Sequence, residues 1–126
     1  MYKFPYGIAD FKTIREEHYF YIDRTEKIKE IEKVGNVITF LRPRRSGKSL
    51  LVNTFKNYYD VNAKENFDKL FSGLEISKYP TETMGKYLIL NFDFSKISAY
   101  GDVDNIVQSF GIYCNECVKD FYVNYK

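Results

Sequence analysis

The order of patterns along this 126-residue chain predicts an α/β layered fold, in which a small, mainly parallel sheet is flanked by helices. Short runs of aromatic and β-branched residues alternate with stretches of helical periodicity. A Gly-Lys-Ser turn follows one of these runs and precedes a helical stretch. No linker or low-complexity tract divides the chain, so residues 1–126 are expected to form a single module.

Two short elements are expected before residue 24. Apolar residues recur at helical spacing between Ile8 and Ile14 and predict one or two turns of helix. The next segment, 18–23, is aromatic and β-branched and predicts a short strand. His18 is the only histidine of the chain and has no partner visible in the sequence, so it is interpreted as a strand-end residue.

A second helix and the strand that follows it are expected between residues 25 and 41. Thr25 is a suitable N-cap for a helix with Ile28, Ile31 and Val34 on one face. Gly35 is expected to end this helix, because glycine adopts the left-handed backbone at low cost. The apolar segment 36–41 then predicts a strand that leads into the Gly-Lys-Ser turn.

The rest of the chain predicts a helix, a less regular region, a strand and a long helix. The helix is expected over 48–59, with a buried face made of Leu50, Leu51, Thr54, Phe55 and Tyr58. Residues 60–79 are polar and predict one short helix around Phe67, Leu70, Phe71 and Leu74. Segment 87–92 predicts a strand, and apolar residues at spacings of three and four predict an amphipathic helix from about Asp102 onward.

The segment from Arg42 to Ser49 has the layout of a phosphate-binding loop between a strand and a helix. Successive backbone N–H groups and a helix N-terminus can surround a polyphosphate, and Lys48 would reach its β and γ phosphates. The Ser49 hydroxyl would hold Mg²⁺. We therefore expect a nucleotide site made of Arg44, Arg45, Ser46, Gly47, Lys48 and Ser49.

Arg42 occupies the position where the usual G-x-x-x-x-G-K-[ST] pattern has its first glycine. Pro43 partly compensates, because proline fixes its own φ and biases the preceding residue toward an extended backbone. The alternative interpretation is an ordinary basic turn between a strand and a helix.

Several blocks of the chain resemble a known family. They are segments 4–11, 14–16, 21–25, 40–51 and 88–94, in this order. The chain resembles the first part of the AAA-ATPase-like module that opens many bacterial proteins with a C-terminal PD-(D/E)xK nuclease-like domain. The resemblance implies a truncated P-loop NTPase-like fold, with ATP and Mg²⁺ held by Gly47, Lys48 and Ser49. It also implies that Arg-Pro-Arg-Arg-x-Gly-Lys-Ser is the family's own form of the loop.

Hydrolysis is a weaker expectation than binding. A metal partner and a group that orients the attacking water are both needed, and the resemblance places the acidic pair that supplies them on a later strand. No such pair is present in this chain. Asp93, after an apolar run, is a candidate metal partner, but a strand-end cap or turn residue is the preferred interpretation. No catalytic residue is therefore assigned.

Two other pairs of residues were weighed as candidate sites. The two cysteines, Cys114 and Cys117, lie on the apolar face of the last predicted helix, and a zinc site would need two more ligands, so core packing is preferred. Asp23 and Arg24 belong to one of the blocks of the resemblance and could lie beside the nucleotide. A capping aspartate in a turn is the preferred interpretation.

Composition limits the other function classes. The net charge is +2, so no global field suggests a nucleic-acid coat, although three of the five arginines fall between Arg42 and Arg45. No apolar run is long enough for a membrane span and no signal peptide is evident, so a cytoplasmic location without membrane contact is expected. Two cysteines in such a chain are expected to be reduced.

The main rival to nucleotide binding is a short, non-catalytic derivative that inhibits or decoys a larger nucleoprotein or defence enzyme. In that case Arg42, Arg44 and Arg45 would contact nucleic-acid phosphates or an acidic patch of a partner. Unpaired sheet edges would favour a homodimer or a partner protein. A small nucleotide kinase is less favoured, because no lid-like arginine segment follows the predicted loop helix.

Overall fold

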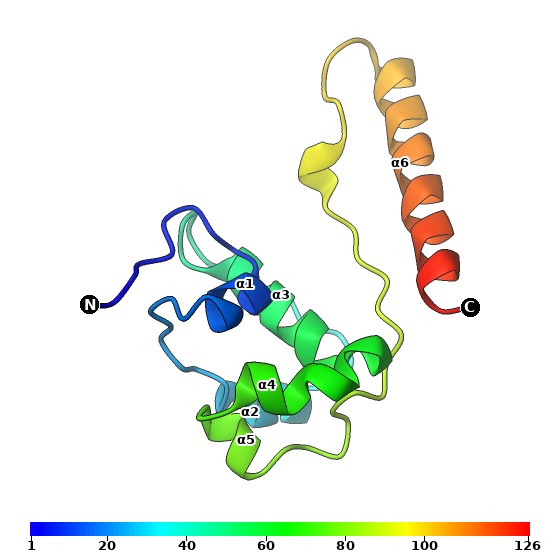
Figure 1. Ribbon diagram of the computed structural model, residues 1–126. Coiled ribbons are helices and arrows are strands. Elements are labelled where there is room, and N and C mark those ends of the chain that lie inside the picture. Colours follow the sequence, from blue (N-terminus) through cyan, green and yellow to red (C-terminus); the bar gives the residue numbers. More distant parts are fainter. The chain divides into compact units, whose positions relative to one another are not determined.

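The computed structural model describes residues 1–126 and consists of helices joined by loops (Figure 1). The elements are α1 (Phe11–Glu16), α2 (Lys27–Val34), α3 (Lys48–Tyr59), η1 (Val61–Asn66), α4 (Phe67–Phe71), α5 (Glu75–Lys78), η2 (Phe94–Lys96) and α6 (Val103–Asn124). The chain divides into two compact units, Met1–Tyr87 and Leu88–Lys126. Each unit is described by itself.

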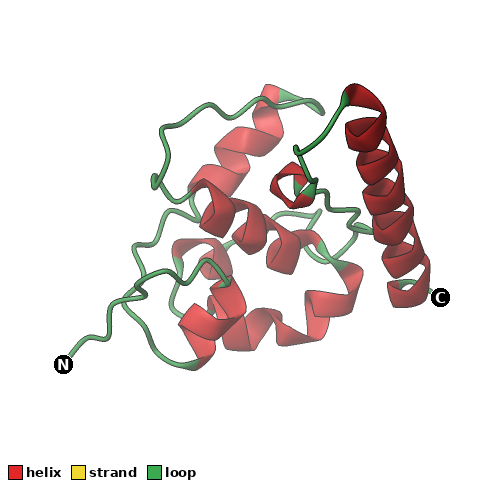
Figure 2. Cartoon of the chain, turned by 90° about the horizontal axis from the view of Figure 1, so that it is seen from above, coloured by secondary structure: helices red, strands yellow, loops and turns green.

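The predicted α/β layered fold is wrong, because the chain forms no strand and no sheet (Figure 2). Segments 18–23, 36–41 and 87–92 lack the ladder of backbone hydrogen bonds that defines a strand. Two isolated parallel bridges, Lys3 to Tyr19 and Asp60 to Tyr87, are all that remains of β pairing. The truncated P-loop NTPase-like sheet and the exposed sheet edges expected for partner binding are therefore absent as well.

The apolar side chains of these three segments are largely exposed. Val37 is 91% exposed and Leu41 is 84% exposed. The others with large exposure are Phe20, Ile22, Ile38, Phe40, Tyr87, Leu88, Leu90 and Phe92. An apolar run shows that a segment is suited to a sheet, but a strand forms only where another segment pairs with it. The helices bury other residues instead, and these runs stay outside the core.

The helical predictions were more successful. α3 has the predicted bounds, Lys48–Tyr59, although only Thr54 and Tyr58 of its expected buried face are fully buried. α6 begins after Asp102, whose side chain accepts the Asn105 N–H, as expected of an N-cap. α2 ends before Gly35 as predicted, but its N-cap is Glu26 and not Thr25.

The core of unit 1 is formed by helices. Its buried apolar residues are Phe11, Ile28, Tyr58, Phe67, Leu70, Phe71, Leu74 and Ile76. The ring of Phe71 lies 4.8 Å from that of Phe11 and 5.5 Å from that of Tyr58. These aromatic contacts join α1, α3 and α4. The region after residue 60 supplies five of these core residues. The sequence predicted one short helix there, around Phe67, Leu70, Phe71 and Leu74, and α4 confirms it.

Unit 2 consists of a loop, η2 and the 22-residue helix α6. Two tyrosine hydroxyls of the C-terminal part hold the preceding loop. The Tyr125 hydroxyl accepts the Ile89 N–H at 2.9 Å, and the Tyr113 hydroxyl accepts the Asp93 N–H at 2.6 Å. No residue of α6 is fully buried. None of the helices, α6 included, combines the length and the apolar character that crossing a membrane requires.

Candidate functional site

The predicted phosphate-binding loop is a tight turn that leads directly into α3. Turn residues Arg44 and Arg45 are followed by a bend at Ser46 and Gly47, and the helix begins at Lys48. Arg45 has a φ of 61° and Gly47 has a φ of 84°, so two left-handed residues fall within three positions. Such alternation turns successive N–H groups toward one side of the backbone, as in anion-binding nests. Glycine suits position 47 because side chains are strained at this φ.

Five consecutive backbone N–H groups, from Ser46 to Leu50, have no acceptor within the chain. The first helical hydrogen bond of α3 runs from the Leu51 N–H to the Gly47 carbonyl at 2.9 Å. No side chain caps this end of the helix, since Gly47 occupies the N-cap position. Unpaired donors at a helix N-terminus, together with the positive end of the helix dipole, favour an anion.

Lys48 lies across the turn. Its ammonium group donates a hydrogen bond to the Arg42 carbonyl oxygen at 2.8 Å. This bond closes the loop between its first residue and the first residue of α3. The Ser49 side chain is exposed, and its hydroxyl makes no hydrogen bond within the chain. Lys48 and Ser49 are thus adjacent to the unpaired N–H groups.

The three arginines of the loop carry no counter-ion. Arg42, Arg44 and Arg45 are exposed, and the three ion pairs of the protein involve other residues. The Arg42 guanidinium lies over the Phe40 ring, 5.6 Å from its centroid. The loop therefore presents uncompensated positive charge around the N-terminus of α3.

Residues 5–126 match the model of the AAA-ATPase-like family, which is described as "predicted AAA-ATPase". The chain belongs to this family. Membership covers the loop, both units and the blocks on which the resemblance was based.

The chain is also similar to an uncharacterized protein in the vnfD 5′ region of Azotobacter chroococcum mcd 1. The two are 36% identical over 75 residues, which is 59% of this chain and 14% of that relative. The chain therefore spans only a small part of the relative's length. No solved structure matches the chain.

Asp93, the candidate metal partner, has the role of a turn residue in the structure. Its carboxylate accepts the Ser95 N–H at 3.1 Å and the Ser95 hydroxyl at 2.6 Å, and so caps η2. The Ser95 hydroxyl and N–H lower the pKa of Asp93, which keeps the carboxylate charged for this capping bond. The interpretation of Asp93 as a turn residue is confirmed, whereas the strand that it was expected to end is absent.

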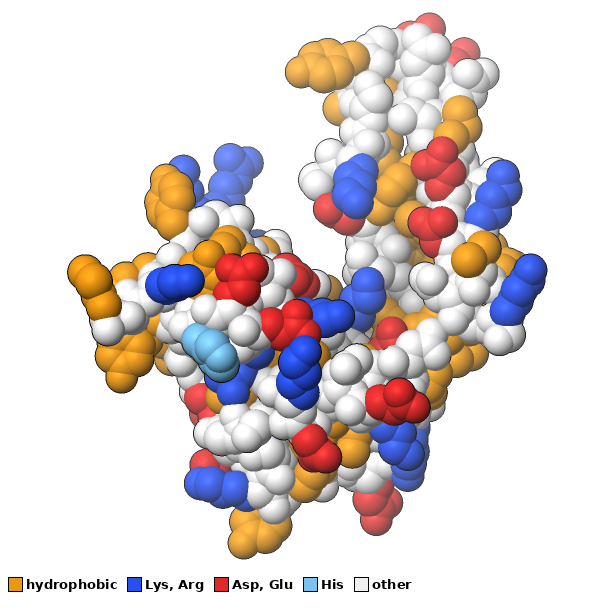
Figure 3. Space-filling view, viewed as in Figure 1, with side chains coloured by type: hydrophobic (Ala, Val, Ile, Leu, Met, Phe, Trp, Pro, Cys, Tyr) orange, Lys and Arg blue, Asp and Glu red, His pale blue; other side chains and the backbone are white.

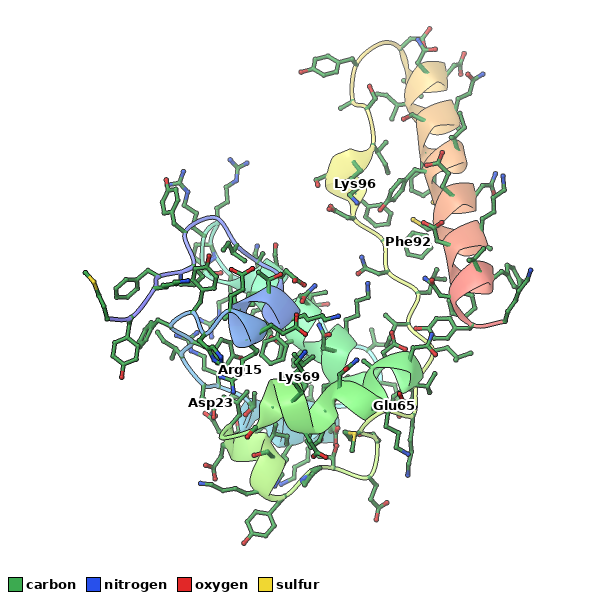
Figure 4. All side chains as sticks on the ribbon, in the orientation of Figure 1. Arg15, Asp23, Glu65, Lys69, Phe92 and Lys96 are labelled. Atoms are coloured by element: carbon green, nitrogen blue, oxygen red, sulfur yellow. The ribbon has the colours of Figure 1, made fainter.

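Asp23 likewise has a structural role, as the preferred interpretation expected. Its carboxylate accepts the Thr25 N–H at 2.9 Å and the Glu75 N–H at 2.6 Å. Arg24 is exposed and its side chain makes no hydrogen bond or ion pair. The nearby Arg15 donates from Nε to the Leu70 carbonyl at 2.7 Å and from Nη2 to the Ser72 carbonyl at 2.6 Å (Figure 4).

One residue that holds the loop helix in place was missed from the sequence. The Asn53 side chain accepts the N–H of Phe11, the first residue of α1, at 2.8 Å. The Asn57 amide donates to the same Asn53 side chain at 3.2 Å. Asn53 thereby fixes α1 against α3 one turn beyond the loop. No local sequence pattern reveals this contact, because its two partners are 42 positions apart.

The remaining candidates form no site. Cys114 and Cys117 are free and half-buried, and no group of three metal-binding side chains exists in the structure. His18 follows the C-cap of α1, Glu17, and has a φ of 56°. The N–H of the next residue, Tyr19, donates a hydrogen bond to the Ile14 carbonyl at 3.0 Å. This is the left-handed termination of a helix, so His18 is a C-terminal turn residue and not a strand end.

Proposed function

We propose that the chain binds a nucleoside triphosphate, ATP in particular, at the turn formed by Arg44, Arg45, Ser46, Gly47, Lys48 and Ser49. The proposal depends above all on the five consecutive unpaired N–H groups from Ser46 to Leu50. A polyphosphate supplies oxygen acceptors at the spacing that such a turn requires. Membership in a predicted AAA-ATPase family supports the same ligand.

Lys48, the loop amides and Ser49 have separate proposed roles. Lys48 exchanges its present bond to the Arg42 carbonyl for the β and γ phosphates. The N–H groups after Arg45 donate to phosphate oxygens. Ser49 holds Mg²⁺, and its exposed hydroxyl, which has no partner in the chain, fits a metal that prefers oxygen ligands. The bound Mg²⁺ would neutralise phosphate charge.

Efficient hydrolysis by this chain alone is not part of the proposal. No acidic pair follows an apolar, strand-like run in residues 1–126, and the Asp93 carboxylate is engaged by Ser95. We therefore propose a nucleotide-binding module over residues 1–126 with no catalytic residue of its own. The C-terminal nuclease-like domain implied by the resemblance stays a prediction, as does a cytoplasmic location.

Thermal unfolding tests this proposal. A ligand that binds only the folded state adds roughly 2.7 kcal/mol to its stability at a hundredfold excess over Kd. We expect Mg-ATP to raise Tm by several degrees for the wild type. Lys48→Ala should abolish this rise, whereas Lys56→Ala, an exposed change on the same helix, should keep it. If millimolar nucleotide leaves the wild-type Tm unchanged, nucleotide binding at this loop is ruled out.

A second candidate is a non-catalytic derivative that binds another protein, as an inhibitor or decoy, or that forms a homodimer. The exposed apolar side chains of both units favour it, and they are visible on the face shown in Figure 3. A surface of this kind is typical of protein interfaces. Sedimentation velocity over a wide concentration range tests the homodimer directly. A single monomeric species throughout would contradict it.

A further inference from the structure

Positive charge is concentrated in one part of the sequence. Between Gly35 and Asp60 the chain has five cations and no acidic residue: Arg42, Arg44, Arg45, Lys48 and Lys56. The whole chain has a net charge of +2, so all other residues together have a net charge of −3, which is +2 minus +5. Residues 36–59 therefore form a basic segment in a chain that is otherwise acidic, and four of its five cations lie between Arg42 and Lys48.

The three loop arginines are available to a partner, unlike several other cations of the protein. Lys27, Lys69 and Lys78 are paired with glutamates, and Arg15 is bound to two carbonyl oxygens. No glutamate and no carbonyl oxygen binds the guanidinium groups of the three loop arginines, Arg42, Arg44 and Arg45, and all three residues are exposed. The Arg42 guanidinium lies over the Phe40 ring. Because this contact already restricts the side chain, Arg42 loses less conformational entropy when a ligand binds.

We infer that Arg42, Arg44 and Arg45 form a contact surface for the phosphodiester backbone of nucleic acid. This surface shares Arg44 and Arg45 with the proposed nucleotide site and extends it by Arg42. It goes beyond that site, because a single triphosphate bound by Lys48 and the loop amides does not require all three guanidinium groups. Arginine matches phosphate oxygens with paired N–H donors. Three guanidinium groups within four residues suit a ligand that repeats its charge at short intervals, as a nucleic-acid strand does.

The expected recognition is independent of base sequence. Contacts to phosphates position a protein on nucleic acid but do not distinguish bases. Binding then depends on the release of counterions, and log K falls with log salt concentration by roughly 0.9 for each phosphate neutralised on duplex DNA. Three arginines therefore contribute about 2.7 to this slope.

Fluorescence anisotropy with a short labelled DNA duplex, in the absence of nucleotide and Mg²⁺, tests the inference. The triple variant Arg42→Gln, Arg44→Gln, Arg45→Gln should lose most of its affinity, and the salt slope should fall by roughly one for each arginine removed. The matched control is Lys33→Gln, Lys86→Gln, Lys119→Gln. It removes the same total charge from exposed lysines that have no ion pair, and it should bind nearly as the wild type does.

The inference is overturned if the wild type does not bind the duplex at low salt, or if both triple variants lose affinity equally. It is also overturned if polyglutamate binds as tightly as the duplex through the same arginines, because the partner would then be an acidic protein surface. Circular dichroism and Tm must show that each variant is folded. The nucleotide proposal is tested separately, since Lys48→Ala should lose the Mg-ATP shift and keep most duplex binding.

Discussion

The carboxylate of Asp23 accepts the backbone N–H of Glu75 at 2.6 Å, although the two residues are 52 positions apart in the sequence. The same carboxylate accepts the Thr25 N–H and hydroxyl, and the Thr25 hydroxyl accepts the N–H of Ile76 at 3.1 Å. Together these bonds satisfy donors at the N-terminus of the four-residue helix α5. Asp23 and Thr25 therefore fix the segment before α2 to the N-terminus of α5.

Asp23→Ala should destabilise unit 1 by about 1–2 kcal/mol, because it leaves the N–H groups of Thr25 and Glu75 without their acceptor. Urea unfolding followed by circular dichroism measures the change. Asp68→Ala is the control, since this exposed residue in the first turn of α4 makes no hydrogen bond and should cost only a few tenths of a kcal/mol. Equal losses in the two variants would show that the contact to Glu75 contributes little.

The same carboxylate predicts a pH dependence. Burial raises the pKa of Asp23, but hydrogen bonds from Thr25 and from the Glu75 backbone lower it by more, so the pKa lies below its ordinary value of 3.8. A group with a lowered folded-state pKa contributes stability above its unfolded pKa and loses it as the pH falls through the folded pKa. We expect the gap between wild type and Asp23→Ala to be complete near neutral pH and to shrink below pH 3.8. A gap that stays constant down to strongly acidic pH would contradict this.

Arg15 provides a third prediction. Its guanidinium group donates to the carbonyls of Leu70 and Ser72, which lie at the C-terminal end of α4, and it lies over the Tyr21 ring. Arg15→Gln should cost roughly 1.5–3 kcal/mol, because two charge-assisted bonds are lost. Arg15→Lys should recover only part of this, since an ammonium group cannot reproduce the planar fork. Chemical denaturation tests both variants, and Arg24→Gln, which removes an exposed arginine without such bonds, should stay close to the wild type.

Some of these features could be predicted from the sequence. α3 and α6 were located well, because a helix is specified by its own periodicity and by caps such as Asp102. The turn before α3 could be expected from the Gly-Lys-Ser pattern, although the left-handed backbone of Arg45 and Gly47 could not. Asp93 could be expected to be a turn residue from its position after an apolar run, although no strand precedes it.

The strands could not be predicted in the same way. Val37 to Leu41 has the composition of a strand, yet pairing depends on a neighbour that the segment does not itself contain. The contacts of Asn53 with Phe11 and of Asp23 with Glu75 were also invisible, because each joins distant positions. The free N–H groups of the loop could be expected from its motif, but the bond from Lys48 to the Arg42 carbonyl could not.

Glu32 provides a fourth prediction. Its Oε1 atom accepts the hydroxyls of Tyr59 at 2.9 Å, Thr81 at 2.9 Å and Thr83 at 2.6 Å, which ties α2 and α3 to the segment after α5. Glu32→Ala should cost on the order of 1–3 kcal/mol, because three partly buried hydroxyls lose their acceptor. Differential scanning calorimetry tests this against Glu82→Ala, an exposed change without such a cluster. Burial and Glu32 also raise the pKa of Tyr59, so Glu32→Ala should lower the pKa of that hydroxyl.

The last prediction concerns unit 2, where two tyrosine hydroxyls accept backbone N–H groups of the loop that precedes η2. Tyr113→Phe removes the acceptor of the Asp93 N–H, and Tyr125→Phe removes that of the Ile89 N–H, while both variants keep their rings. Hydrogen exchange measured by NMR should therefore accelerate at Asp93 in the first variant and at Ile89 in the second. Tyr122→Phe is the control, because this tyrosine is exposed and should change neither rate. If each variant accelerated exchange at both amides equally, the two hydroxyls would affect the loop only by stabilising α6 as a whole. The idea that each hydroxyl holds its own part of the loop would then be excluded.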